Sequence, residues 1–179
     1  MEPLPALLDS GLRQPNAFTC GAQSVVMAAA LAGREVPGDA PALGRLVLAT
    51  HRRLTSYSSD AHLQVPWPRR LGTPPWAVAR EMRHLTGQRY RVRAVVRGSR
   101  ARWWSEVGAA VAHGHPVPVY VGNHVLPRHV VLAVRGEGDD LLLHDPATGH
   151  LRSLTHSSWQ AARLRLSGWD VPWFVVVPH

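Results

Sequence analysis

The chain has 179 residues, of which 45% are hydrophobic and 18% are charged, a balance that supports a buried core and excludes an intrinsically disordered tail. Its 20 basic residues are all Arg and outnumber 12 acidic residues, giving a net charge of +8. The absence of Lys indicates a codon bias, so this charge does not by itself indicate a polyanion-binding function. The single cysteine, Cys20, excludes an internal disulfide and a zinc site built on several thiolates.

No apolar run reaches the roughly 18 residues expected of a membrane span. The segment from Val25 to Ala32 is not typical of a signal peptide, because Glu2 and Asp9 precede it where positive charge is expected. Without an export signal or paired cysteines, we expect a cytoplasmic protein.

Helical patterns dominate the chain before about residue 87. Thr19–Ala32 is rich in small and apolar residues and stops at Gly33, with Thr19 as the expected N-cap. The other elements predicted in this half are a helix over Ala42–Arg53, a Pro-rich loop over Val65–Pro75 anchored by Trp67 and Trp76, and a helix from Trp76 to about Gly87.

Strand patterns dominate the rest of the chain. Helices followed by antiparallel strands predict an α+β fold, with the helices on one side of the sheet. We expect one domain over residues 1–179, with a helical half at about 1–87 and a sheet half at about 88–179. The predicted strands are Tyr90–Arg97, Val117–Val121, His129–Arg135, Asp140–His144, His150–Leu154 and Trp173–Val177, and the predicted helices are Ala101–His113 and Trp159–Leu166.

Cys20 is expected in the first turn of the first helix, where unpaired N–H groups and the helix dipole favour a thiolate. Gln14 lies upstream on an approach that Pro15 stiffens, so that its amide is placed to donate to an oxyanion together with the Cys20 N–H. Gly21 would leave room for a substrate carbonyl beside the sulfur. Because a lone cysteine is more often a buried filler residue, its neighbours decide the interpretation.

Thiol catalysis also needs an imidazole held in one tautomer. His129 starts an apolar strand, and Asp145 ends the next strand just before a Pro-Gly turn. A hairpin closed by Gly136–Asp139 brings the start of the first strand beside the end of the second. His129 and Asp145 are therefore expected to be neighbours.

The segments Q-x5-C-G with an Ala-rich helix, H-G-H-P-V-P-V-Y-V, H-V-V-L-A-V and D-P-A-T-G resemble the papain-like cysteine peptidase superfamily. They are most similar to stand-alone members of the bacteriocin-processing, double-glycine leader peptidase-like family, with residues 37–75 the least family-like stretch. The resemblance implies a papain-like fold, and we expect no cofactor. It implies Cys20 as nucleophile, His129 as general base and acid, Asp145 as the residue that orients the imidazole, and Gln14 as oxyanion donor.

The expected function is a cysteine peptidase that acts on a peptide or acyl substrate through an acyl-enzyme on Cys20. An acyltransferase or amide-forming enzyme with the same triad stays open, as does a non-catalytic nucleic-acid or protein-binding module on the same scaffold. Nucleic acid would be bound through Arg89, Arg91 and Arg93, although a solvated strand face is the more ordinary explanation. The sequence does not predict the oligomeric state, the substrate or the pathway.

Two further sets of histidines bear on the site. The spacing of His113, His115 and His124 matches no closed zinc pattern, so no metal is expected. His144 is expected to point to the opposite face of its strand from Asp145, with a structural or solvent-facing role.

Overall fold

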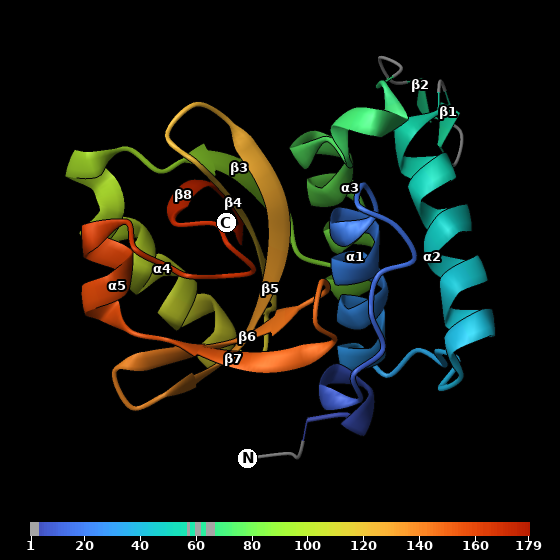
Figure 1. The fold of residues 1–179 in the computed structure, drawn as a ribbon, viewed down its shortest axis with the longest axis horizontal. Helices are drawn as coiled ribbons and strands as arrows, with labels where there is room; N and C mark the ends of the chain where they lie inside the picture. Colours follow the sequence, from blue (N-terminus) through green and yellow to red (C-terminus); the bar gives the residue numbers. More distant parts are fainter. Residues whose placement is uncertain (1–3, 57, 60–61, 64–66) are drawn as a thin grey trace.

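The computed structural model describes residues 4–56, 58–59, 62–63 and 67–179. Within these ranges the chain forms helices and a six-stranded antiparallel sheet (Figure 1), which confirms the α+β class. The helices are α1 Cys20–Leu31, α2 Ala40–Thr55, α3 Pro75–Thr86, α4 Arg100–Ala112 and α5 His156–Ala161, with 3-10 turns η1 Ala6–Asp9, η2 Arg69–Leu71 and η3 Arg97–Ser99. The strands are β1 Ser58–Ser59, β2 His62–Leu63, β3 Tyr90–Ala94, β4 Val117–Gly122, β5 Pro127–Glu137, β6 Asp140–Asp145, β7 His150–Leu154 and β8 Val171–Pro178.

The large sheet has the strand order β3-β8-β4-β5-β6-β7, and a separate two-stranded sheet pairs β1 with β2. In the large sheet, the β5–β6 hairpin turns at Gly138 and Asp139, because Glu137 already pairs with Asp140. Gly138 has a φ of 60°, the left-handed conformation that a tight hairpin turn requires. The hairpin places the start of β5 and the end of β6 at one edge of the sheet, as predicted, although the turn is shorter than the four residues expected.

Helices cover both faces of the sheet, which corrects the prediction that they lie on one side. Val130, Leu132 and Val134 of β5 belong to a core shared with α1, α2 and α3. Val131 and Ala133, which point the other way, belong to a second core with α4 and α5. Figure 1 shows the curved sheet between the two groups of helices.

The first helix is surrounded by other elements, since Cys20 through Ala28 are all buried. Helices α2 and α3, together with β5, pack against it. The three helices predicted in the first half are confirmed in position, and Gly33 and Gly87 adopt the left-handed conformation expected after a helix end, each with a φ of 74°. Val65 and Pro66 of the predicted Pro-rich loop lie outside the described residues.

The predicted helix over Trp159–Leu166 is wrong beyond Ala161. Thr155 starts α5 earlier than expected, because its side chain accepts a hydrogen bond from Ser158 N. Ala162, with a φ of 51°, ends the helix. Leu164 and Leu166 are then buried at alternate positions, which is the period of an extended chain rather than a helix.

The segment before Cys20 is bound to the turn that follows β6. Gly11 N donates to Gly149 O at 3.0 Å, and Gln14 N donates to Pro146 O at 2.8 Å. A Cβ on Gly149 would lie 2.4 Å from the carbonyl carbon of Gly11, so the close approach of the two chains requires a glycine there. The contact fixes the path of the chain that leads to Cys20.

None of the helices in the described ranges combines the length and the apolar character that crossing a membrane requires.

Candidate active site

Cys20 is the first residue of α1, and 4% of its surface is exposed. Thr19 occupies the N-cap position, but its side chain makes no capping hydrogen bond, contrary to the expectation. The Thr19 hydroxyl instead donates to Asn16 O at 3.0 Å within the preceding turn. The first hydrogen bond of the helix runs from Gln23 N to Thr19 O. The backbone amides before Gln23 in the first turn therefore make no hydrogen bond within the helix.

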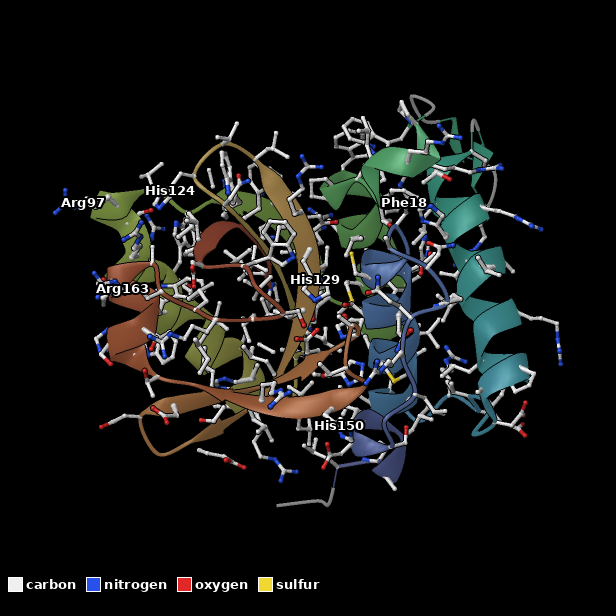
Figure 2. All side chains as sticks on the ribbon, in the orientation of Figure 1. Phe18, Arg97, His124, His129, His150 and Arg163 are labelled. Carbon is white, nitrogen blue, oxygen red and sulfur yellow. The ribbon has the colours of Figure 1, made fainter. Side chains whose placement is uncertain are left out.

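His129 and Asp145 are neighbours, as the hairpin predicted. His129 Nε2 lies 2.7 Å from Asp145 Oδ1, and both side chains are buried. A carboxylate accepts hydrogen bonds, so Nε2 carries the proton in this bond and Nδ1 is left for another partner. In Figure 2, His129 lies between β5 and α1, the helix that begins at Cys20.

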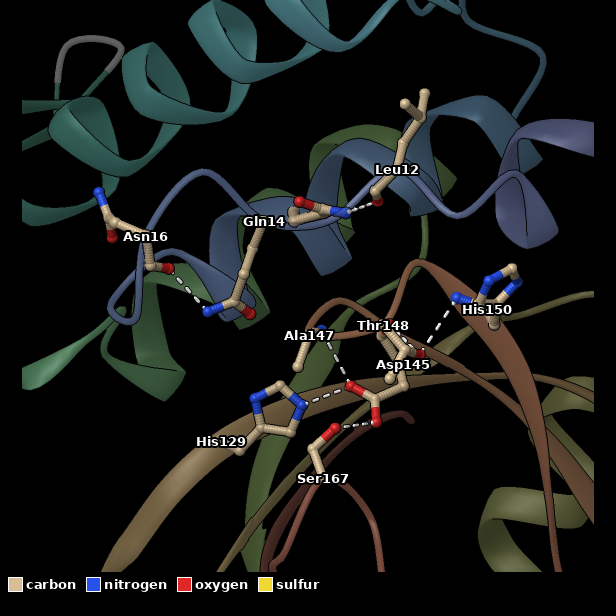
Figure 3. Close-up of polar contacts among 10 residues, drawn as sticks. Leu12, Gln14, Asn16, His129, Asp145, Ala147, Thr148, His150 and Ser167 are labelled. Atoms are coloured by element: carbon tan, nitrogen blue, oxygen red, sulfur yellow. Dashed lines mark hydrogen bonds and ion pairs between the residues drawn. The ribbon is translucent and has the colours of Figure 1, made fainter.

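Two further groups hold the Asp145 carboxylate (Figure 3). Ser167 Oγ donates to Asp145 Oδ2 at 2.5 Å, and Ala147 N donates to Asp145 Oδ1 at 3.0 Å. Sequence reasoning missed Ser167, which belongs to a loop where its own φ is 48°. The bond from Ala147 N is typical of a turn that begins with Asp, whose side chain binds a backbone N–H two residues on.

Burial and hydrogen bonding together shift the protonation of this pair. Burial lowers the pKa of His129, but hydrogen bonds to Asp145 and to Cys20, with the negative charges of both, raise it to about 9. Burial raises the pKa of Asp145, but hydrogen bonds from His129 and Ser167 outweigh it and leave the pKa below its usual value. At neutral pH the buried imidazole therefore carries a proton while the carboxylate is ionised.

A cleft of about 540 Å³ opens above Cys20 and His129. Cys20 reaches it from the helical side of the molecule and His129 from the sheet, so that the cleft lies between a sulfur and an imidazole. Burial raises the pKa of Tyr120, a further residue of the cleft lining, and the nearby Cys20 adds to this effect. The helical wall is formed by Ala17, Phe18, Trp67 and Arg70 to Trp76, and the sheet wall by Tyr120, Asn123, Leu126 to Val130, Trp169 and Phe174.

Gln14 lies on the approach to Cys20 but does not line the cleft. Its Nε2 donates to Asn16 O at 2.7 Å, and its buried Oε1 has no partner among the described residues. An amide nitrogen has two protons, so this bond leaves one donor of Gln14 available.

Gly21 lies where α1 packs closely against its neighbours. A Cβ at this position would lie 2.9 Å from Thr73 Cβ and 3.6 Å from Val130 Cγ2. The missing side chain therefore allows α1 to pack against Thr73 and the sheet.

The remaining polar residues singled out in the sequence lie away from this arrangement. His144 is fully buried and its Nδ1 binds Leu8 O at 2.8 Å, so it is structural and not solvent-facing. Arg91 is exposed and Arg93 half-buried on β3, the strand at one edge of the sheet. Within the described ranges, no group of three His, Cys, Asp or Glu side chains is arranged to hold a metal ion.

No protein-family model matches the sequence, and no curated protein matches it. Among solved structures, the chain is similar to the peptidase domain of Streptococcus ComA, described as a bifunctional ABC transporter involved in a quorum-sensing pathway. The similarity covers 94% of this chain and 97% of that domain, with 13% sequence identity and a TM-score of 0.49. A likeness of this degree shows neither the activity nor the site residues of this chain.

Proposed function

We propose that this chain is a papain-like cysteine peptidase, a thiol hydrolase that cleaves a peptide or amide bond through an acyl-enzyme on Cys20. The observation that carries the proposal is the placement of the Cys20 sulfur and the Asp145-bound imidazole of His129 on the two sides of one cleft. The nucleophile stands at a helix N-terminus, the base is buried beside it, and a third group fixes the tautomer of the base.

In the first half of the reaction, the Cys20 thiolate attacks the substrate carbonyl carbon, and a C–S bond forms as an electron pair moves to the carbonyl oxygen. The N–H of Cys20 donates to this oxyanion, and the second N–H of Gln14 joins it after the Gln14 side chain turns, because in the structure that amide is bound to Asn16 O and does not line the cleft. His129 then gives its Nδ1 proton to the leaving nitrogen, the C–N bond breaks, and a thioester remains on Cys20.

In the second half, water gives a proton to His129 Nδ1 and attacks the thioester carbon. The C–S bond breaks, which releases a carboxylic acid and restores the thiolate beside a protonated imidazole. Asp145 keeps its bond to Nε2 throughout, so that Nδ1 is the nitrogen that exchanges protons.

The direct test of the activated thiol is its rate of alkylation by an epoxide or chloromethyl ketone reagent at pH 7. We expect Cys20 to react at least about tenfold faster than a free thiol, and His129→Ala to remove this advantage. His113→Ala is the matched control, because His113 is exposed and does not line the cleft. A wild-type rate no higher than that of a free thiol would contradict the proposal.

An acyltransferase is the second candidate, supported by the apolar lining of the cleft. Trp67, Trp76 and Phe174 surround the site with surfaces that hold water poorly, which favours an amine over water as the acceptor of the acyl group. Incubation with acyl donors, with and without added amines, followed by mass spectrometry of the products, distinguishes transfer from hydrolysis.

A further inference from the structure

Large apolar side chains gather around the mouth of the cleft. Phe18, Leu71 and Trp76 are 41%, 66% and 40% exposed, and all three line the cleft. Trp76 also meets Trp67 edge to face, with 5.1 Å between ring centroids. A contiguous patch of exposed apolar side chains marks a binding surface, whereas single exposed apolar residues are ordinary on a protein surface.

The opposite wall continues this aromatic surface. Tyr120 and Phe174 meet edge to face, with ring centroids 6.3 Å apart, and both line the cleft together with Trp169. An apolar group that enters the cleft would therefore contact rings on both sides. The volume of about 540 Å³ falls in the range of roughly 300–1,000 Å³ that holds bulky ligands.

Apart from the Cys20–His129 pair, the charged groups of the lining have one sign. Arg70 stands on the helical wall and Arg128 on the sheet wall, and both are exposed. The lining formed by the described residues contains no Asp or Glu. Two cations on the walls of an apolar cleft attract an anionic group and repel a cationic one.

From these walls we infer the substrate class: an acyl donor with a bulky apolar or aromatic side chain next to the scissile carbonyl and an acidic residue close to it. The inference rests on the proposed function, because it takes the cleft as the path by which the acyl donor reaches Cys20. A pair of glycines next to the scissile carbonyl would leave the aromatic walls of the cleft in contact with water. The apolar surface of these walls would then not be buried and would contribute nothing to binding.

Binding is measured on the Cys20→Ala variant by isothermal titration, so that affinity does not depend on turnover. Four peptides of equal length carry either Gly-Phe or Gly-Gly at the two central positions and either Glu or Lys beside them. We expect the Phe-Glu peptide to bind about tenfold more tightly than the glycine peptide with Glu and than the Phe-Lys peptide at low salt.

Variants of the walls test the two parts separately. Trp76→Ala should cost the Phe peptides about fivefold in affinity, whereas Val96→Ala, which removes an exposed apolar group outside the cleft lining, should not. Arg70→Glu combined with Arg128→Glu should reverse the preference for Glu over Lys, and Arg91→Glu, on the edge strand β3, should leave it unchanged.

Equal affinity of the four peptides, or tighter binding of the glycine or Lys peptides, would overturn this substrate class. That result is separate from the alkylation test at Cys20, which addresses the activated thiol whatever the cleft binds. A fast-reacting thiol with no preference among the peptides would thus retain the proposed function and reject the substrate class.

Discussion

Replacement of Ser167 by alanine tests how the Asp145 carboxylate is held. Ser167 Oγ donates to Asp145 Oδ2 at 2.5 Å, and the carboxylate is only 1% exposed. The substitution removes a hydrogen bond to a buried ionised group, and such bonds contribute about 1.5–3 kcal/mol. Because Ser167 itself is exposed and water can partly replace its hydroxyl, we expect a loss of about 1–2 kcal/mol in the free energy of unfolding at pH 7.

The same loss should depend on pH with a definite sign. The pKa of Asp145 is below its ordinary value of 3.8, and the hydrogen bond from Ser167 is one cause. A carboxyl group whose pKa is lowered by folding contributes stability above its unfolded pKa and loses that contribution as the pH falls through the folded pKa. The destabilisation by Ser167→Ala should therefore be complete at pH 7 and should shrink below about pH 3.8.

Urea unfolding at a series of pH values measures this effect, and Ser153→Ala provides the matched control. Ser153 also donates to a carboxylate, Asp140 Oδ2 at 3.2 Å, but this pair lies at the surface. We expect the control to change the free energy of unfolding by less than about 0.5 kcal/mol. Equal effects of the two substitutions, or a Ser167→Ala effect that does not change with pH, would refute the proposed role of Ser167 in holding the ionised carboxylate.

The remaining predictions concern two glycines and the histidine. Gly21→Ala should destabilise by about 1–3 kcal/mol, since its Cβ would lie 2.9 Å from Thr73 Cβ, whereas Gly108→Ala, which meets nothing within 4 Å in α4, should stabilise by up to about 1 kcal/mol. Gly149→Ala should lower both the thermal stability and the alkylation rate of Cys20 more than Gly138→Ala does, because Gly138 has a similar positive φ but open space around it. Equal effects of the two substitutions would contradict the close contact between Gly149 and the segment at Gly11. Because folding raises the pKa of His129 to about 9, its protonated form contributes stability below pH 6.5, and this contribution is lost as the pH rises towards about 9. Urea titrations should therefore show the free energy of unfolding falling between these pH values. His129→Gln should remove this fall.

The adjacency of His129 and Asp145 could be predicted because it depends on local features. A hairpin with a Gly-containing turn joins the two strands, and both residues lie near its open end. The coverage of both sheet faces was missed, although the sequence contains a signal for it. The continuous apolar run Val130–Val134 lacks the alternation of a strand with one solvated face, and such runs are typical of strands buried on both sides.

Other parts of the site depend on contacts that leave no local pattern. Ser167 follows Asp145 by 22 positions and reaches it from a loop whose left-handed residues, Ala162, Arg165 and Ser167, are not the glycines that usually mark such conformations. The orientation of the Gln14 amide depends on a competing carbonyl, Asn16 O, which the spacing between Gln14 and Cys20 does not indicate. Predictions from spacing therefore located the residues but not all of their hydrogen-bond partners.

The attachment of the N-terminal segment to the end of β6 also has a consequence for folding. Asp9 Oδ1 accepts a hydrogen bond from Leu151 N, 142 positions later, next to the bonds that join Gly11 and Gln14 to the turn after Asp145. Such a long loop closes at a high entropic cost, so contacts of this kind form late compared with a local hairpin. The β5–β6 hairpin can bring His129 and Asp145 together early, whereas the sulfur joins them only when the two distant segments meet. Refolding monitored by alkylation of Cys20 should thus recover more slowly than the β-sheet signal.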